Sequence, residues 1–186
     1  AICKSTILAR EWINTPSNEK TPEKLARSMV SLAKKEGLKV QVLNEKQLIQ
    51  KKFGAMLAVA AGSQSKPSLV VLEHKSRGAK KTIALIGKGV TFDSGGLNIK
   101  TGGSISDMKS DMSGAAAVAA TMIAIAKLKA KVNVIGAIPL VENMPSGKAT
   151  RPGDIIRSYA GKTVEIGNTD AEGRLILIDA MSYVVK

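Results

Sequence analysis

The stretch of chain that decides the fold runs from residue 82 to residue 100 and reads TIALIGKGVTFDSGGLNIK. Its first five residues form an apolar run that predicts a buried strand. The glycines that follow predict a loop, because glycine adopts backbone conformations that other residues avoid. Lys88 and Asp93 therefore lie where a strand runs out into a glycine-rich loop. Since ligands collect at the strand ends of α/β sheets, this loop is the first candidate for a functional site.

Strands and helices alternate on both sides of this stretch. Periodicity, caps and turn residues predict helices at residues 5–12, 21–36, 45–53, 112–129 and 171–185. Further strands are predicted at residues 39–43, 68–72 and 132–140, together with a short strand pair at residues 155–159 and 163–166. The alternation predicts an α/β fold with a mixed, largely parallel sheet flanked by helices on both faces.

A short acidic segment precedes the alanine-rich helix predicted at residues 112–129. Residues 108–114 read MKSDMSG, so Asp111 falls at or just before the start of that helix. For an isolated aspartate in this position, capping of the helix is the commoner role, because its side chain accepts hydrogen bonds from free backbone N–H groups. The other interpretation of Asp111 is a ligand that faces the glycine-rich loop.

The segment from Asn168 to Leu175 reads NTDAEGRL and joins an extended stretch to the last predicted helix. Asp170 and Glu172 are separated by one residue, and both can reach one cation if the backbone between them is not helical. Arg174 offers an anion site at their edge. For such a pattern on its own, a surface loop would be the commoner interpretation, but here two other charged clusters accompany it.

Together the three segments supply four carboxylates and one amine, with two further cations. These residues are Lys88, Asp93, Asp111, Asp170 and Glu172, with Lys100 and Arg174 as the further cations. Carboxylates that converge in a partly buried pocket raise one another's pKa unless a cation compensates their charge. An oxygen-rich ligand set suits magnesium, manganese or zinc, and two ions bridged by shared carboxylates fit the number of ligands better than one.

In these three blocks the chain resembles the leucyl aminopeptidases, or cytosol aminopeptidases, which are metallopeptidases with two metal ions. Residues 168–175 are similar to the family's signature, and residues 87–100 and 108–114 are similar in order and spacing to its other two metal-binding blocks. The resemblance extends more weakly from about Leu8 to Lys186. It implies an enzyme that releases amino-terminal residues, leucine and similar ones, from peptides by means of a water activated by two metal ions.

The resemblance also implies a role for each residue of the site. Ligands of the more readily exchanged ion would be Lys88, Asp93, Asp111 and Glu172, and ligands of the tighter ion would be Asp93, Asp170 and Glu172. Lys100 and Arg174 resemble the two catalytic cations, and a bicarbonate ion held at Arg174 would be the proton shuttle. Because an amine binds a metal only when it is deprotonated, the pKa of Lys88 must fall far below its usual value of about 10.4.

Two residues outside this set are open to more than one interpretation. Met108 is either an ordinary packing residue or, as the resemblance implies, part of the wall that receives the first side chain of the substrate. His74 is the only histidine, and it lies outside the three blocks. We interpret it as a surface residue of a strand rather than as a general base.

The length of the chain bears on its activity. Members of the resembled family have a separate amino-terminal domain and a longer catalytic domain, so we expect residues 1–186 to form a single, incomplete catalytic domain. The family's hexamer would then lack some of its contacts. Alternatively, the chain is a shortened, non-catalytic basic module that binds DNA or a protein partner. A module of that kind has no chemical reason to retain Lys88 and Lys100 together, which favours the enzyme.

The charge of the chain is strongly basic and unevenly distributed. The formal net charge is +13, and residues 1–81 contribute +10 of it, with 16 basic and 6 acidic residues. Solvated helix faces are the simplest explanation for this excess. Contact with nucleic acid is the alternative, since some bacterial members of the resembled family bind DNA. Against it, an aromatic content of 3% leaves few platforms on which single-stranded bases could stack.

Cysteine usage and hydropathy indicate where the protein works. The single cysteine, Cys3, excludes an internal disulfide framework and fits a reducing compartment. Apolar stretches fall short of the ~20 residues of a membrane span, and Lys4, Arg10 and Glu11 interrupt the pattern of a secretory leader. We therefore expect a cytoplasmic protein with a peptide substrate and no membrane contact.

Overall fold

The computed structural model describes residues 1–185, and residue 186 lies outside the described part. Within this range, five strands form one sheet in the order β1-β2-β5-β3, and β4 also pairs with β5. The strands are β1 (Lys39–Asn44), β2 (Ser68–His74), β3 (Thr82–Ile86), β4 (Gly89–Asp93) and β5 (Asn133–Asn143). One edge of β5 pairs with β2, and its other edge pairs first with β3 and then with β4. β5 is therefore the central strand of the sheet.

The sheet is mixed, as predicted, but parallel pairing does not predominate. β3 and β4 run parallel to β5, whereas the β1–β2 and β2–β5 pairs are antiparallel. A parallel pair needs a crossover of a dozen or more residues that returns along the sheet. The segment with α5 provides one between β4 and β5. The helices between β1 and β2 have only six and seven residues, and the chain reverses there instead.

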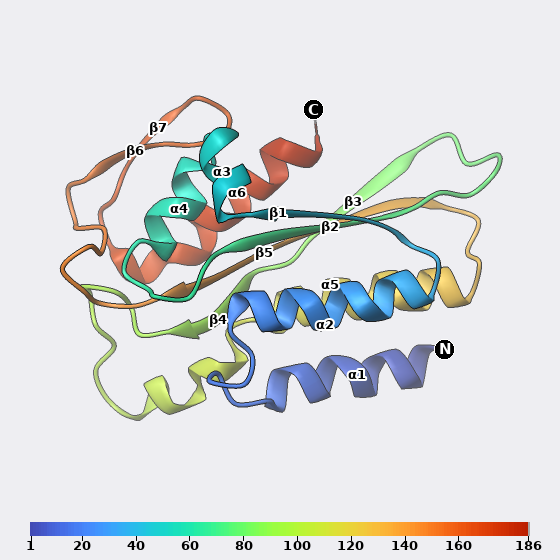
Figure 1. The fold of residues 1–186 in the computed structure, drawn as a ribbon, viewed down its shortest axis with the longest axis horizontal. Helices are drawn as coiled ribbons and strands as arrows, with labels where there is room; N and C mark the ends of the chain where they lie inside the picture. Colours follow the sequence, from blue (N-terminus) through green and yellow to red (C-terminus); the bar gives the residue numbers. More distant parts are fainter. Residues whose placement is uncertain (186) are drawn as a thin grey trace.

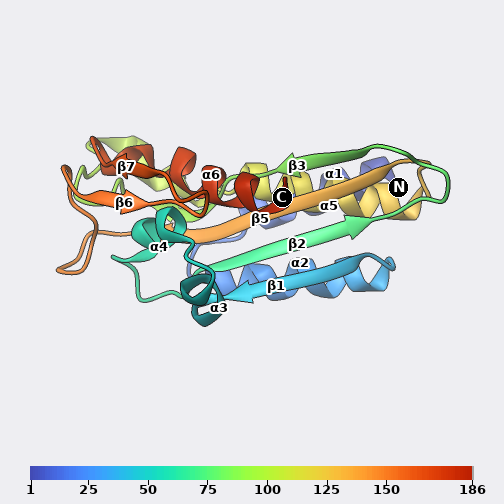
Figure 2. The ribbon, with the colours of Figure 1, turned by 90° about the horizontal axis from the view of Figure 1, so that it is seen from above.

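Helices cover both faces of the sheet, as Figure 1 and Figure 2 show. One face carries α1 (Ile2–Asn14), α2 (Pro22–Lys35) and α5 (Ser113–Lys127), and the other carries α3 (Glu45–Gln50), α4 (Gly54–Ala60) and α6 (Glu172–Val184). Because side chains alternate between the faces of a strand, the neighbours Leu69 and Val70 of β2 enter different cores. The predicted α/β class with helices on both faces is confirmed.

The predicted strand pair near the carboxyl end is also confirmed: β6 (Ile155–Arg157) and β7 (Thr163–Glu165) pair antiparallel. The helix predicted at residues 45–53 ends at Gln50, because the chain turns at Lys52, whose φ is +62°. The helix that starts at Gly54 was not predicted. Within residues 1–185, none of the helices combines the length and apolar character that a membrane crossing requires.

Two predictions about residues 82–100 are corrected. Residues 82–84 were predicted to be buried, but they are exposed because β3 is an edge strand that pairs only with β5 among the described residues. The glycine-rich part was predicted to be loop throughout, but residues 89–93 form β4. Glycine is disfavoured in strands, so the pattern hid a strand that is held by long-range pairing with β5.

Candidate metal centre

Lys88 lies in the gap between β3 and β4, where the pairing partner of β5 changes. Pro139, which has no N–H to donate, lies in the part of β5 that faces this gap. The glycine before Lys88 permits a close approach of two backbone segments, because a Cβ at Gly87 would lie 2.3 Å from the carbonyl oxygen of Gly114. This contact brings Lys88 against the start of α5, next to Asp111.

Asp93 ends β4 and is buried. Its Oδ1 accepts hydrogen bonds from the backbone N–H of Gly95 at 2.9 Å and from Nδ2 of Asn143 at 2.8 Å. Its Oδ2 pairs with Nζ of Lys100 at 2.9 Å. One oxygen of Asp93 is therefore bound to the protein framework, and the other faces a cation.

Asp111 does not cap the alanine-rich helix. The N-cap position of α5 is Met112, without a side-chain cap, and Asp111 directly follows a 3-10 helix, η1 (Gly103–Ser110). Oδ1 of Asp111 instead accepts a hydrogen bond from Nζ of Lys88 at 2.7 Å. The capping interpretation is wrong, and Asp111 faces the glycine-rich segment.

The motif of residues 168–175 makes a tight turn into α6. Oδ1 of Asn168 accepts the backbone N–H of Asp170 at 2.7 Å, and residues 169–171 form a short 3-10 helix, η2 (Thr169–Ala171). Glu172 is the first residue of α6 and is 2% exposed. Gly173 leaves room for Lys88, because a Cβ at position 173 would lie 2.8 Å from Cε of that lysine.

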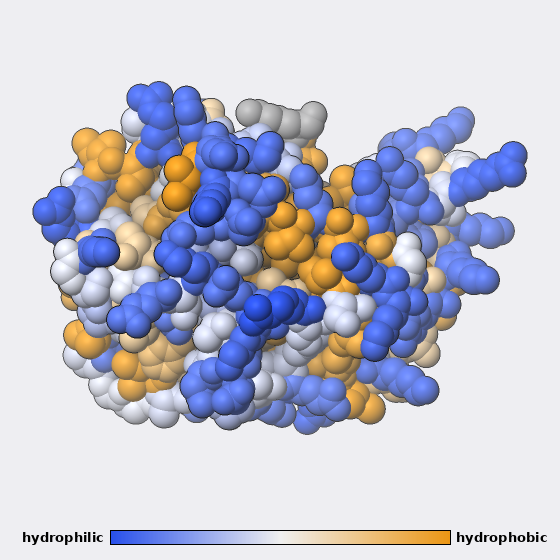
Figure 3. All heavy atoms as spheres, viewed as in Figure 1, coloured by the Kyte–Doolittle hydropathy of each residue, from blue (hydrophilic) through white to orange (hydrophobic). Residues whose placement is uncertain are grey.

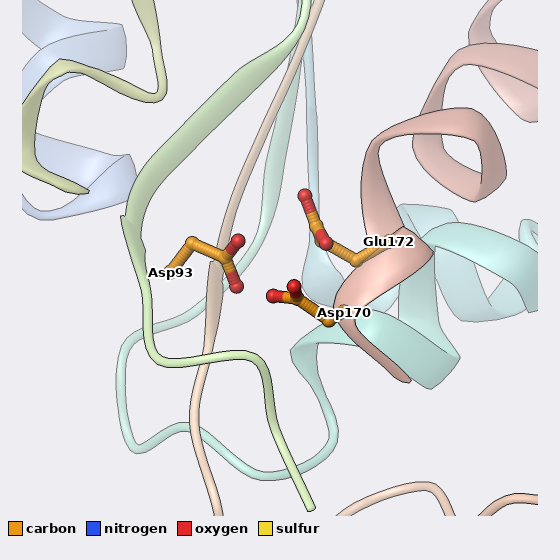
Figure 4. A group of neighbouring side chains, drawn as sticks. All are labelled: Asp93, Asp170 and Glu172. Carbon is orange, nitrogen blue, oxygen red and sulfur yellow. The ribbon is translucent and has the colours of Figure 1, made fainter. Parts of the chain in front are cut away.

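The three sequence blocks meet in one cluster. Nζ of Lys88 lies 2.7 Å from both Asp111 Oδ1 and Glu172 Oε1. Nζ of Lys100 lies 2.9 Å from Asp93 Oδ2 and 2.5 Å from Asp170 Oδ1. Asp93, Asp170 and Glu172 each offer an oxygen, and these atoms lie within 4.8 Å of one another. Figure 4 shows Asp93 at the strand end facing Asp170, in the turn before α6, and Glu172, at the start of α6.

Burial and ion pairing shift the pKa values of this cluster. Burial lowers the pKa of Lys88, but hydrogen bonds to Asp111 and Glu172 and the charges of both outweigh burial, so the pKa of Lys88 is raised. Burial raises the pKa of the carboxyl groups of Asp111 and Glu172, and the opposing effect of Lys88 does not cancel this rise. Four carboxylates face two ammonium groups here, so the cluster keeps a formal charge of −2 and has an electrostatic need for further cations.

Two buried oxygens support metal binding at this cluster. Among residues 1–185, Asp111 Oδ2 and Glu172 Oε2 have no hydrogen-bond partner. A buried carboxylate oxygen without a donor costs free energy, and a divalent cation is the partner that hard oxygen ligands prefer. The donor set and its net charge therefore fit divalent ions that Asp93, Asp170 and Glu172 could hold.

The remaining predicted residues lie at the edge of the cluster or outside it. Arg174 is exposed on the first turn of α6 and forms no ion pair in the described part of the chain. Met108 is half-buried in η1. His74 is at the end of β2 and is half-buried rather than on the surface, with Nε2 3.0 Å from the carbonyl oxygen of Ala130. It does not join the acidic cluster.

Sequence reasoning missed the polar residues that hold the two acidic loops together. Nδ2 of Asn143 donates to Asp93 and, at 3.0 Å, to the carbonyl oxygen of Thr169. Oγ1 of Thr169 donates to Gly95 O at 2.6 Å, and it accepts the backbone N–H of Asn98 at 2.8 Å. Thr169 and Asn98 lie within the predicted blocks and could have been suspected. Asn143 lies outside them, and its only signal was its position shortly after the strand predicted at residues 132–140.

The fold and the cluster define an α/β domain whose loops hold carboxylates around cations. This chain belongs to the cytosol aminopeptidase family, because the family's catalytic-domain model matches residues 7–186. A probable cytosol aminopeptidase of Streptomyces coelicolor is 52% identical over 181 residues, which cover 97% of this chain and 35% of that protein. A probable cytosol aminopeptidase of Brucella melitensis is 52% identical over 184 residues, which cover 98% of this chain and 38% of that protein.

Solved structures agree with this membership. The leucine aminopeptidase of Caenorhabditis elegans superposes with a TM-score of 0.95 at 39% identity, over 98% of this chain and 37% of that chain. The predicted resemblance to the leucyl aminopeptidases is therefore confirmed. The chain spans between a third and two fifths of the length of these relatives.

Proposed function

We propose that this chain carries the metal centre of an aminopeptidase that releases amino-terminal residues, leucine and similar ones, from peptides. The observation that carries the proposal is the pairing of two lysines with four carboxylates from three separate blocks, at 2.5–2.9 Å. Family membership supports the same class of reaction. A non-catalytic basic module is the weaker alternative, because it has no chemical use for a lysine held between two carboxylates.

The five predicted ligands would bind two ions. Lys88, Asp93, Asp111 and Glu172 would hold the more readily exchanged ion, and Asp93, Asp170 and Glu172 the tighter one. Manganese and zinc both suit this donor set. Bound ions would supply Lewis acidity toward the scissile carbonyl and lower the pKa of a water. Before Lys88 could bind an ion, its ammonium group would have to lose a proton, and the ion pairs with Asp111 and Glu172 favour the protonated form.

Two cations would assist the reaction, Lys100 from within the cluster and Arg174 from its edge. Burial lowers the pKa of Lys100, but hydrogen bonds to Asp170 and Asp93 outweigh burial and raise it, so this lysine stays protonated. Its ammonium would stabilise the negative charge that develops on the carbonyl oxygen. Arg174 would hold a bicarbonate ion as proton shuttle, and Met108 would line the wall that receives the first side chain of the peptide.

The extent of the domain, the oligomeric state, the location and the substrate are proposed by analogy with the family. We propose that residues 1–186 belong to a single catalytic domain, which the longer relatives extend. By the same analogy the working form is a homo-oligomer, a hexamer, located in the cytoplasm. Its substrate would be a peptide with a free amino terminus.

Metal titration by calorimetry, paired with a leucine anilide assay, tests the proposal. We expect the chain to bind two Mn²⁺ or Zn²⁺ ions, and Asp170→Ala to remove the tighter one. Lys100→Ala should keep both ions and lose turnover. Asp154→Ala removes a carboxylate that pairs with Arg151 instead, so it serves as the control. Two bound ions without turnover mean that activity needs residues outside this chain, whereas absence of bound ions contradicts the proposal.

The position of the basic residues favours nucleic-acid contact as a second property. The loop after β2 and the connection from α5 to β5 lie at the end of β5 that is remote from the carboxylates (Figure 1). Asn133 joins them, because its Oδ1 accepts the N–H of Ser76 at 2.8 Å and its Nδ2 donates to Ala79 O at 2.9 Å. Hydrophilic side chains project from this end in Figure 3. At this end of the molecule, the exposed cations that form no ion pair within residues 1–185 are Arg77, Lys80, Lys81, Lys129 and Lys131.

Binding of a random-sequence DNA duplex, measured by fluorescence anisotropy at several salt concentrations, tests this second property. A variant with serine at four of these positions (Lys80, Lys81, Lys129 and Lys131) should bind more weakly. The slope of log affinity against log salt concentration should become shallower by roughly 0.9 for each phosphate that is no longer neutralised. The control has serine in place of the exposed Lys46, Lys51, Lys148 and Lys162, so both variants have the same net charge. Equal weakening of the two would mean that overall charge, rather than this surface, binds the duplex.

A further inference from the structure

The side chain of Asn143 connects the two acid-bearing loops of the cluster. Asn143 is the last residue of β5, lies opposite Asp93 in the parallel register, and is 5% exposed. Its Nδ2 donates to Asp93 Oδ1 at 2.8 Å and to the carbonyl oxygen of Thr169 at 3.0 Å. The two N–H bonds of one amide are thus divided between the end of β4 and the turn before α6.

The hydrogen bond from Asn143 helps to fix the orientation of the Asp93 carboxylate. Oδ1 accepts from both Asn143 and the backbone N–H of Gly95, so the protein itself satisfies this oxygen. Oδ2 faces the cluster, where it pairs with the ammonium of Lys100. A carboxylate held in this way offers one oxygen, in a fixed direction, to whatever binds between the loops.

We propose that Asn143 is a positioning residue of the metal centre: it sets the spacing between Asp93 and the Asp170–Glu172 turn and commits Asp93 to binding through Oδ2. The proposal rests on the proposed function. It follows the general rule that hydrogen bonds to a ligating side chain orient that ligand and tune the affinity for the metal. The amide is suited to this position because it supplies two donors, whereas an aspartate would supply none and would face Asp93 with a second negative charge.

The backbone of Asn143 has a separate role, which makes a side-chain test informative. Its carbonyl oxygen accepts from the N–H of Ser94 at 3.0 Å and from Oγ of Ser94 at 2.8 Å. These bonds hold β4 against β5 and do not depend on the amide. Asn143→Leu and the smaller Asn143→Ala therefore remove the two amide donors and keep this pairing.

Asn133, at the other end of the same strand, provides a matched control. It is also an asparagine whose amide bonds to a loop, at Ser76 and Ala79 of the β2–β3 connection, and it lies far from the acidic cluster along β5. Asn133→Leu and Asn143→Leu should both lower the melting temperature. Only Asn143→Leu should weaken Mn²⁺ or Zn²⁺ binding in calorimetry, by about 10- to 100-fold for the tighter ion.

The absorption spectrum of bound cobalt distinguishes a residue that positions a metal ligand from one that only stabilises the fold. The visible absorption of bound Co²⁺ reports its coordination geometry, so the spectrum should change in Asn143→Leu and Asn143→Ala and stay unchanged in Asn133→Leu. If Asn143→Leu fails to fold, Asn143→Ala carries the test. Unchanged affinity and spectrum in the Asn143 variants, or equal changes in the Asn133 variant, overturn this inference alone. A wild-type chain that binds no ion overturns both this inference and the proposed function.

Discussion

Helix α6 carries two buried carboxylates that are held in opposite ways. Glu172, at its start, is 2% exposed, and Asp179, two turns later, is 0% exposed. Oδ2 of Asp179 accepts the N–H of Met56 at 2.9 Å, and Oδ1 accepts the N–H of Tyr159 at 2.7 Å. Oε1 of Glu172 pairs with Lys88, and its Oε2 has no hydrogen-bond partner among residues 1–185.

The difference separates a structural acid, Asp179, from Glu172, the acid that we propose as a functional one. Burial raises the pKa of both groups, but backbone N–H groups oppose it at Asp179, whereas Lys88 opposes it at Glu172. A carboxylate with both oxygens satisfied by backbone joins α6 to α4 and β6 and has little capacity left for a ligand. A buried carboxylate with a free oxygen is costly unless a ligand completes it. Burial alone does not identify a site, whereas the partners of each carboxylate oxygen do.

Removal of the structural acid should have the largest effect. Asp179→Ala removes the carboxylate that accepts the N–H groups of Met56 and Tyr159, so the free energy of unfolding should fall by about 3 kcal/mol, measured by urea denaturation. Glu165→Ala removes an exposed acid of β7 and should stay within about 0.5 kcal/mol of the wild type. Equal stabilities of the two variants would show that Asp179 is not a structural acid.

Addition of metal should stabilise the functional end of the helix by a similar amount. Mn²⁺ at about 100 times its Kd should raise the free energy of unfolding by about 2.7 kcal/mol, because the ion binds only the folded state. The same concentration should stabilise Asp179→Asn as much as the wild type, and Glu172→Gln much less. Thermal or urea unfolding with and without the ion measures both. A loss of the metal effect in Asp179→Asn would mean that the two acids are not separate in function.

A methyl group beside Lys88 should have a smaller effect. In Gly173→Ala the new Cβ would lie 2.8 Å from Cε of Lys88, so this lysine must move from its position between Asp111 and Glu172. We expect the affinity for the more readily exchanged ion to fall about 10-fold, or about 1.4 kcal/mol, in calorimetry. Gly167→Ala meets open space among the described residues and should leave the affinity unchanged.

Neutralising the functional acid in the absence of metal should have the smallest effect. Glu172→Gln keeps the shape of the side chain, and Lys88 keeps its pair with Asp111 at 2.7 Å. One like charge is also removed from a cluster with an excess of carboxylates. The free energy of unfolding measured in a chelator should therefore change by less than about 1 kcal/mol. A loss as large as that of Asp179→Ala would show that Glu172 is mainly structural.

Much of the candidate site could be predicted because its chemistry is concentrated in short blocks. Lys88 and Glu172 were expected to meet, and Nζ and Oε1 lie 2.7 Å apart. The roles of these residues as ligands stay predictions. Asn143 could not be predicted, because one asparagine after an apolar strand has no local signature. Its amide matters only because β4 pairs with β5 in a register that places Asp93 opposite it.

The fold was predictable to a similar degree. The strand at residues 82–86 and the helices α2 and α6 follow patterns within one segment, and their bounds differ little from those predicted. A mixed sheet was predicted correctly, but parallel pairing does not predominate and β3 is not buried, because strand direction and burial both depend on which distant strand lies alongside. In this sheet the neighbour is β5, which is separated from β3 by α5 along the chain.

By itself, the sequence determined which side chains are proposed to carry the chemistry and where the glycines let the backbone turn, because these properties depend on residue type and near neighbours. Only the tertiary structure decided that, within residues 1–185, Glu172 keeps an unpaired oxygen while Asp179 keeps none. Both are acids on the same helix, and nothing local distinguishes them. The partners of Asp179 come from α4 and from the turn after β6, and that of Glu172 from the gap between β3 and β4, so long-range packing assigned the two roles.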